Sequence, residues 1–224
     1  MLKNWSKLEK PESEELDARL EAAKEKLNVL QMQIKDRKLP VLVLFEGWGT
    51  AGKGSTLGKI ITNIDPRFFK VATMDIPTEE ERRKPFLYRY FKTIPEAGKF
   101  CFLDSGWMDE VTRECLHGAL KEKEYKKRID SVKRFERQLT DNGYLVMKFF
   151  FHISKKEQKS RIKMLDKDPS TSWRVSNNDV WQNEHYDKCL KVYDQYLDDT
   201  NASTSPWYIV DAQSRKWAQL QVLE

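Results

Sequence analysis

A glycine-rich turn that carries one lysine lies between residues 47 and 55. From Gly47 to Lys53 the spacing is G-x-x-x-x-G-K, in which small residues let successive backbone N–H groups point at phosphate oxygens while the lysine adds a positive charge. Gly54 follows the lysine, so the hydroxyl that holds Mg²⁺ in the strict motif comes one place later, on Ser55. An apolar run precedes the turn and an apolar helical face follows it, which favours a phosphate-binding loop over a plain glycine turn. The loop residues predicted to contact phosphate are Gly47, Gly49, Thr50, Ala51, Gly52, Gly54 and Ser55.

A carboxylate ends a second apolar run. Residues 100–103 are Phe, Cys, Phe and Leu, and Asp104 follows them directly. A buried strand that ends in this way beside a phosphate-binding loop can place its acid at Mg²⁺ or at the water shell of the ion. Any strand can end in aspartate, so the pattern takes its meaning from the loop. Ser55 and Asp104 are therefore the predicted Mg²⁺ ligands.

A basic helix is predicted over residues 155–166, with Ser154 as its N-cap. Its cations are Lys155, Lys156, Lys159, Arg161 and Lys163. Such a row can be a solvated charged face, or it can belong to a lid that closes over phosphates, and the sequence leaves the two interpretations open.

The composition limits the classes of protein that fit. The chain has 224 residues, of which 39% are hydrophobic, enough for one α/β domain with a buried sheet. Lys and Arg number 40 against 35 Asp and Glu, and a net charge of +5 is too small to indicate a nucleic-acid partner. No window approaches ~18 uninterrupted apolar residues, so no membrane span is predicted. The cysteines share no C-x-x-C spacing and the histidines no metal-ligand spacing, which favours reduced thiols in the cytoplasm and structural histidines.

A long amphipathic helix is predicted over residues 13–38. Leucine, alanine and isoleucine recur there at alternating spacings of four and three, while Glu and Lys fill the other positions. This heptad seam can pack on the chain's own surface or on a second copy of the chain. Pro40 ends the helix, so we divide the chain into a helical extension over residues 1–38 and a phosphate-loop domain over residues 39–224.

Strands and helices alternate through the rest of the chain. Apolar runs predict five strands, over residues 41–45, 69–74, 100–104, 145–153 and 205–211. Helices are predicted directly after the phosphate loop and over residues 79–91, 107–120, 123–142, 155–166, 178–199 and 214–224. This alternation predicts an α/β fold, a three-layer sandwich in which helices cover both faces of a mainly parallel five-stranded sheet.

On these residues the chain resembles the type 2 polyphosphate kinase family, P-loop kinases that move phosphoryl groups between inorganic polyphosphate and nucleotides using Mg²⁺. The likeness extends from about residue 41 to residue 224. It is strongest to the N-terminal domain of the AMP-phosphorylating members that fuse two such domains. The segments that carry it, in order, are FEGWGTAGKG (45–54), PTEE (77–80), PFLYR (85–89), FLDSGW (102–107), FE (135–136), SKKEQKSR (154–161), Trp173 and PW (206–207).

The resemblance implies a role for each group. Lys53, Asp104 and Arg89 would be catalytic, with Lys53 on the terminal phosphates and Arg89 on the phosphate of the acceptor. A lid would extend over about residues 154–180. The other implied binding residues are Glu79, Glu80, Lys156, Lys159 and Arg161. The expected partners are inorganic polyphosphate and an adenine nucleotide, AMP or ADP, with a second copy of the chain or a tandem partner domain, and neither nucleic acid nor membrane.

Two positions depart from the family pattern. Catalytic members carry Asp where this chain has Gly49, and Arg where it has Ser105. The first change removes a carboxylate that handles Mg²⁺ or phosphate, and the second removes a cation that would neutralise the transferred group. We therefore expect a catalytically weakened copy. The helix that ends at Glu224 is still amphipathic there, and we expect the chain to be part of a longer tandem protein.

Two other functions fit parts of the sequence. A nucleoside monophosphate kinase of the thymidylate kinase kind also has Phe-Glu-Gly before its phosphate loop, but it carries the hydroxyl directly after the lysine, where this chain has Gly54. A scaffold without catalytic activity would bind polyphosphate or contact a partner domain without turnover.

Overall fold

The computed structural model describes residues 1–74 and 76–224. Its centre is one sheet of five strands in the order β2-β3-β1-β4-β5, and every neighbouring pair is parallel. The strands are β1 (Val41–Gly47), β2 (Phe69–Thr73), β3 (Phe100–Asp104), β4 (Leu145–His152) and β5 (Trp207–Asp211). Strands β1 and β3 are buried along almost their whole length, which is why their sequences are nearly continuous apolar runs. The predicted parallel five-stranded sheet is confirmed.

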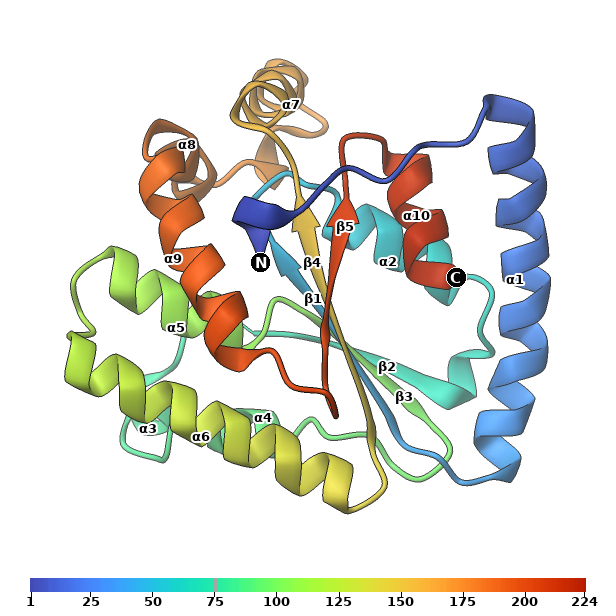
Figure 1. The fold of residues 1–224 in the computed structure, drawn as a ribbon, viewed down its shortest axis with the longest axis horizontal. Helices are drawn as coiled ribbons and strands as arrows, with labels where there is room; N and C mark the ends of the chain where they lie inside the picture. Colours follow the sequence, from blue (N-terminus) through green and yellow to red (C-terminus); the bar gives the residue numbers. More distant parts are fainter. Residues whose placement is uncertain (75) are drawn as a thin grey trace.

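Helices cover both faces of the sheet (Figure 1). One layer contains α1 (Ser13–Asp36), α2 (Lys53–Ile61) and α10 (Arg215–Leu223), and the other contains α5 (Trp107–Leu116), α6 (Glu122–Asp141) and α9 (Tyr186–Thr200). The short helices α3 (Glu79–Arg82) and α4 (Tyr88–Phe91) lie beside α6, and α7 (Lys155–Lys167) and α8 (Asn177–Glu184) lie near the carboxyl ends of β1 and β4. The predicted three-layer α/β sandwich is confirmed.

The N-terminal helix α1 packs on the chain's own surface. Its buried residues Leu16, Leu20 and Ala23 form a small core with Trp217 and Leu220 of α10. At the rim of this contact, Arg19 donates to Glu224, with 2.6 Å between Nη2 and Oε2. The heptad seam therefore has a partner within the chain.

Two predicted helices are each divided in the structure. The helix predicted over residues 79–91 is interrupted between α3 and α4, because Pro85 has no N–H to continue the helical hydrogen bonds. The helix predicted over residues 178–199 is interrupted at His185, between α8 and α9. At this break Tyr186 stacks on Trp48, with 4.0 Å between ring centroids, and donates from its hydroxyl to Ile153 O. These contacts lie between distant segments, so helical periodicity alone could not predict them.

An ion pair lies inside the core. Lys148 of β4 is 0% exposed, and its Nζ lies 2.7 Å from Glu136 Oε2 of α6 and 3.0 Å from Thr200 O. Glu136 also accepts from Trp107 Nε1 and from Ser205 Oγ. Both members of the pair are thus hydrogen-bonded to other buried groups of the chain.

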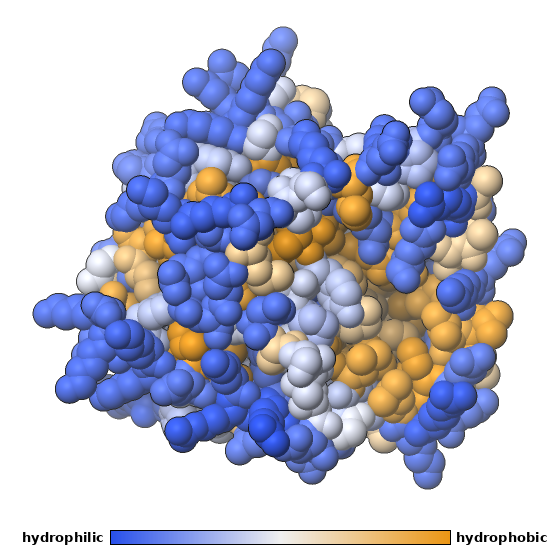
Figure 2. All heavy atoms as spheres, in the orientation of Figure 1, coloured by the Kyte–Doolittle hydropathy of each residue, from blue (hydrophilic) through white to orange (hydrophobic). Residues whose placement is uncertain are grey.

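An apolar groove of about 370 Å³ lies between α1, the sheet and the end of α10. Figure 2 shows hydrophobic side chains gathered in the hollow between α1 and the strands. In the part of the chain that the structure describes, no helix combines the length and the apolar character needed to cross a membrane.

Candidate active site

The turn between β1 and α2 has a backbone that only glycine adopts without strain at two positions. Gly47 has φ 123° and Gly52 has φ 96°. A side chain at Gly47 would also lie 2.7 Å from the backbone nitrogen of Phe151, because β4 passes directly beside the turn. Gly47 therefore meets both a conformational and a steric requirement, and Gly52 meets a conformational one.

Lys53 is the first residue of α2 and folds back over the loop. Its Nζ donates to Gly47 O at 3.3 Å and to Trp48 O at 3.1 Å. These carbonyls belong to the loop itself, so the ammonium group lies at the mouth of the turn beside the N-terminus of α2. A helix N-terminus and a lysine together form a favourable environment for an anion.

Arg161 of α7 supports the loop from behind. It is 5% exposed, and Nη1 donates to Ala51 O at 2.9 Å while Nη2 donates to Ala212 O at 2.7 Å. The sequence placed Arg161 among the phosphate contacts. The structure instead uses its guanidinium to join the loop, α7 and the end of β5, because those carbonyls surround it.

Two glutamines hold the middle of the loop. Gly49 N donates to Gln182 Oε1 of α8 at 3.0 Å, and Gln158 Nε2 of α7 donates to Gly49 O at 3.3 Å. Trp48 is fully buried and donates from Nε1 to His152 Nδ1 at 3.1 Å. Gln158 lies within the segment 154–161, but only the cations of that segment were predicted to bind phosphate, and Gln182 belongs to no motif, so sequence reasoning missed both contacts.

Asp104 lies against the loop, as the strand pattern predicted. A Cβ at Gly54 would be 3.2 Å from Asp104 Oδ2, so the carboxylate lies directly beside the residue that follows the lysine. Ser55, one residue later, lines the same cleft as Asp104 and Lys53. Hydroxyl and carboxylate oxygens are the ligands that Mg²⁺ prefers, and Mg²⁺ is usually held by one or two carboxylates together with substrate phosphates. The residues present fit such an ion.

Residues 1–74 and 76–224 contain no group of three or more His, Cys, Asp or Glu side chains that could form a closed metal centre.

Glu46 is a site residue that sequence reasoning missed. It is buried at the end of β1, and its Oε1 accepts from Gly106 N at 2.9 Å and from Met108 N at 3.2 Å. Burial raises the pKa of this carboxyl to about 8, with a further rise from Asp109, while Lys53 and the two backbone donors lower it. Glu46 thereby ties β1 to the first turn of α5, next to Asp104.

The cleft around the loop has a volume of about 1000 Å³. It is bounded by the loop, the ends of β2 and β3, α5, and the segment from α7 to α8. Its acidic side chains are Asp104, Asp109 and Asp179. Its cations are Lys53, Lys59, Arg113, Arg174 and Arg215. The cleft is therefore large and polar enough for a chain of phosphate groups.

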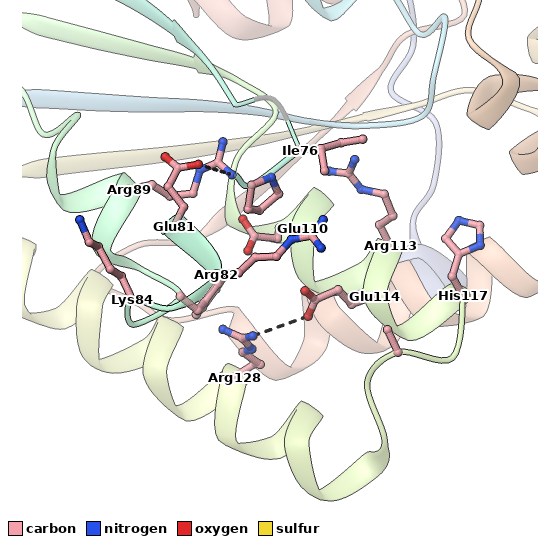
Figure 3. A pocket seen from close by; sticks show the side chains of 13 residues that line it. Ile76, Glu81, Arg82, Lys84, Arg89, Glu110, Arg113, Glu114, His117 and Arg128 are labelled. Carbon is pink, nitrogen blue, oxygen red and sulfur yellow. Dashed lines mark ion pairs between the residues drawn. The ribbon is translucent and has the colours of Figure 1, made fainter. Parts of the chain in front are cut away.

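A second cavity of about 470 Å³ adjoins the cleft, and Ile76 and Arg113 line both (Figure 3). Arg89 is 9% exposed in its wall, with Nη1 3.8 Å from Glu81 Oε2. The other charged side chains of the wall are Arg82, Lys84, Glu110, Glu114 and Arg128. Burial raises the pKa of Glu110, which accepts from Tyr90 Oη at 2.7 Å.

Residues 10–224 match a protein-family model described as "Polyphosphate kinase 2 (PPK2)". This match covers nearly the whole chain. The chain belongs to the polyphosphate kinase 2 family. The resemblance inferred from the motifs is thus confirmed.

Curated relatives of this polyphosphate kinase 2 domain are phosphotransferases. The chain is 34% identical over 200 residues to "Polyphosphate:AMP phosphotransferase" of Pseudomonas aeruginosa. The aligned region covers 89% of this chain and 40% of the relative. The chain is 28% identical over 199 residues to "ADP-polyphosphate phosphotransferase 3" of Rhizobium meliloti, covering 89% of this chain and 70% of the relative. The chain therefore spans less than half the length of the Pseudomonas relative.

Solved structures of the family have the same fold. Polyphosphate kinase 2 from Arthrobacter aurescens superimposes with a TM-score of 0.91 at 27% identity, over 96% of this chain and 77% of that one. A putative polyphosphate kinase 2 from Pseudomonas aeruginosa gives 0.92 at 26% identity, over 99% and 48%.

The structure brings only part of the predicted site together. Lys53, Ser55 and Asp104 share the cleft, and Arg89 lies in the adjoining cavity. Four other predicted binding residues, Glu79, Glu80, Lys156 and Lys159, are exposed and line neither cavity. Glu80 is paired with Lys84 at 2.7 Å. Phosphate contacts by the lysines of α7 remain predictions that require a ligand longer than the cleft.

Arg113 is a cation that the sequence analysis did not single out and that lines both cavities. It lies on α5 and pairs with Asp109 at 2.6 Å. Ser105 supplies no positive charge next to Asp104. Arg113 provides a cation nearby, where the cleft and the second cavity meet. Arg113 lies eight residues after Ser105 on a helix, and it belongs to none of the motifs found in the sequence.

Proposed function

We propose that this domain transfers a phosphoryl group between inorganic polyphosphate and a nucleoside mono- or diphosphate, AMP or ADP, with Mg²⁺. The observation that carries the proposal is the junction of two cavities. One contains the phosphate loop with Lys53 and Asp104, the other contains Arg89, and Arg113 lines both. A donor phosphate and an acceptor phosphate can thus approach each other from two sides.

The cleft would hold the phosphate that is transferred. Lys53 and the N-terminus of α2 would bind its oxygens, and Mg²⁺ held by Ser55 and Asp104 would neutralise charge between neighbouring phosphates. Phosphoryl transfer passes through a state with charge spread over several oxygens, so positioning and cations supply most of the catalysis. Lys53 is displaced from the carbonyls of Gly47 and Trp48 when a phosphate oxygen offers a stronger, charge-assisted bond.

The second cavity would hold the acceptor nucleotide. Arg89 is nearly buried and lies on the wall that adjoins the cleft, which suits a guanidinium that holds the acceptor's phosphate. Relatives of the family are named for AMP, ADP, GDP and nucleoside diphosphates in general. We place AMP and ADP first because the relative from Pseudomonas aeruginosa is named for AMP and the relative from Rhizobium meliloti for ADP.

The domain would work in the cytoplasm, beside a second copy of the chain or a tandem partner domain. The three cysteines are free thiols, as a reducing compartment requires. Light scattering on the purified chain tests the second copy, since a monomer at all concentrations would leave only a tandem partner.

A donor comparison tests the proposed function. The chain is incubated with Mg²⁺, with AMP or ADP as acceptor, and with either polyphosphate or ATP as donor. Formation of ADP or ATP from polyphosphate is the expected result. Turnover with ATP and AMP but not with polyphosphate would instead identify a nucleoside monophosphate kinase. Binding of polyphosphate without turnover would identify a scaffold.

A further inference from the structure

The space beside Gly49 is occupied by a carboxylate from another part of the chain. A Cβ built on Gly49 would overlap Asp179 Oδ1 and would lie 2.7 Å from Asp179 Cγ. Gly49 does not have a positive φ, so its backbone would accept an ordinary residue. Space rather than conformation therefore excludes a side chain at this position.

Asp179 is held in place from its own helix. It lies in the first turn of α8, and its Oδ2 accepts from Ser176 N at 2.8 Å and from Ser176 Oγ at 2.9 Å, which completes a capping box. The other oxygen, Oδ1, is the one directed at Gly49. The orientation of the carboxylate is thus fixed before any ligand arrives.

The same face of α8 contacts the loop a second time. Gln182 lies three residues after Asp179, on the same side of the helix, and accepts the hydrogen bond from Gly49 N. Asp179 also lines the cleft that contains Lys53 and Asp104. Helix α8 is therefore positioned against the phosphate loop and presents one acid to it.

We propose that Asp179 supplies the carboxylate that the loop lacks at Gly49, and that its Oδ1 holds Mg²⁺ or a water of the ion's shell. This inference rests on the proposed function, because it places the ion beside phosphates bound to the loop. The loop then has a carboxylate next to Gly54, from Asp104, and another next to Gly49, from Asp179. Only one side chain fits in the second place, so Gly49 and Asp179 form a complementary pair.

The pair is tested by exchange. Binding of Mn²⁺, used as a probe for Mg²⁺, is measured from the electron paramagnetic resonance signal of the free ion, in the presence of tripolyphosphate. The variants are Asp179→Asn, which keeps the size of the side chain and an acceptor for the cap, Gly49→Asp, and the exchange of both residues, Gly49→Asp with Asp179→Gly. The control is Ser176→Ala, which weakens the cap but keeps the carboxylate. Melting temperatures are recorded for all.

The expected result is a loss of Mn²⁺ affinity in Asp179→Asn of about 10–100-fold, the range found when groups that support a metal are removed. The exchange variant should recover most of that affinity, and Ser176→Ala should keep it. Gly49→Asp alone should melt at a lower temperature than the exchange variant, because its side chain overlaps Asp179.

Unchanged Mn²⁺ affinity in a folded Asp179→Asn variant would overturn the proposal and reduce Asp179 to a helix cap. If that variant also bound tripolyphosphate more tightly in the absence of a divalent ion, the carboxylate would repel phosphate instead of assisting it. Neither result depends on turnover, so a failure of the proposed function in the donor comparison is seen separately.

Discussion

Lys148 lies within strand β4, and Lys53 follows the neighbouring strand β1, yet the charges around the two lysines differ. Lys148 lies inside β4 and is bonded to Glu136 and Thr200 O, and it lies 4.8 Å from the centre of the Trp207 ring. Lys53 follows β1 and is bonded only to carbonyls of its own loop among the hydrogen bonds of the described residues. The fold gives Lys148 a carboxylate partner at 2.7 Å, whereas Lys53 has no ion-pair partner within 4 Å among the described residues.

This difference separates stability from function. A charge that the fold itself neutralises stabilises the native structure, and its loss leaves an unpaired buried partner. A charge at the mouth of a loop contributes little to folding and is available for a ligand. The charges of the cleft should therefore be removable without unfolding the domain, whereas those of the core should not.

The largest expected effect is on the core pair. Lys148→Met leaves Glu136 buried without its cation, which should lower the free energy of unfolding by about 3–5 kcal/mol. Urea unfolding measures the loss. Lys148→Met combined with Glu136→Gln removes both charges and should recover part of it, and a single variant as stable as the wild type would contradict the assigned role of the pair.

Next in size is the loss of Arg113. Arg113→Ala removes the cation that lines both cavities, which should slow transfer about 10²–10³-fold, as the loss of one charge stabiliser typically does. The matched control is Arg137→Ala. Arg137 also pairs with an aspartate four residues away on a helix, but it lies on the exposed side of α6. Equal turnover in both variants would remove Arg113 from the site.

Glu46 should make stability depend on pH. The pKa of its carboxyl is raised from 4.5 to about 8, so between these values the folded chain keeps a proton that the unfolded chain has released. Stability from this group is therefore lost as pH rises through that window. Glu46→Gln keeps an acceptor for Gly106 N and Met108 N but cannot titrate. Its melting temperature should fall less than that of the wild type between pH 5 and 8, and parallel curves would show that Glu46 is ionised throughout.

The smallest effect is expected for the exposed lysines of α7. Changing Lys156, Lys159 and Lys163 to Gln should reduce the salt dependence of binding to long-chain polyphosphate by about 2 in the log–log slope, at about 0.7 per neutralised phosphate. Binding of tripolyphosphate, which fits within the cleft, should keep its slope. If the variant showed the same slope as the wild type for long-chain polyphosphate as well as for tripolyphosphate, α7 would be an ordinary solvated face.

The sequence predicted what depends on local spacing. The phosphate loop, the strand that ends at Asp104 and the parallel sheet follow from patterns within short windows, and all three are present in the structure. The glycine pattern is readable because Gly47 and Gly52 need a positive φ, which restricts the residue type at each place.

The contacts that the sequence could not predict join distant segments. Gln182 and Asp179 contact the loop from α8, which is separated from α9 at His185, where the predicted helix was continuous. Lys148 looked like one polar residue in an apolar strand, and nothing local indicated Glu136 as its partner. Gly49 was interpreted as a missing carboxylate, whereas the structure shows that the position is filled from α8.

Turnover of the wild-type chain and of Lys53→Ala, with polyphosphate, Mg²⁺ and AMP or ADP, tests the central claim most directly. The claim predicts transfer by the wild type and a loss of about 10²–10³-fold in the variant. The free energy of unfolding should change by no more than about 0.5 kcal/mol, because Lys53 is not part of the core. Lys133→Ala, on the exposed side of α6, is the control for removing a lysine. A folded Lys53→Ala variant with wild-type turnover would contradict the claim, because the loop lysine would then not hold the transferred phosphate.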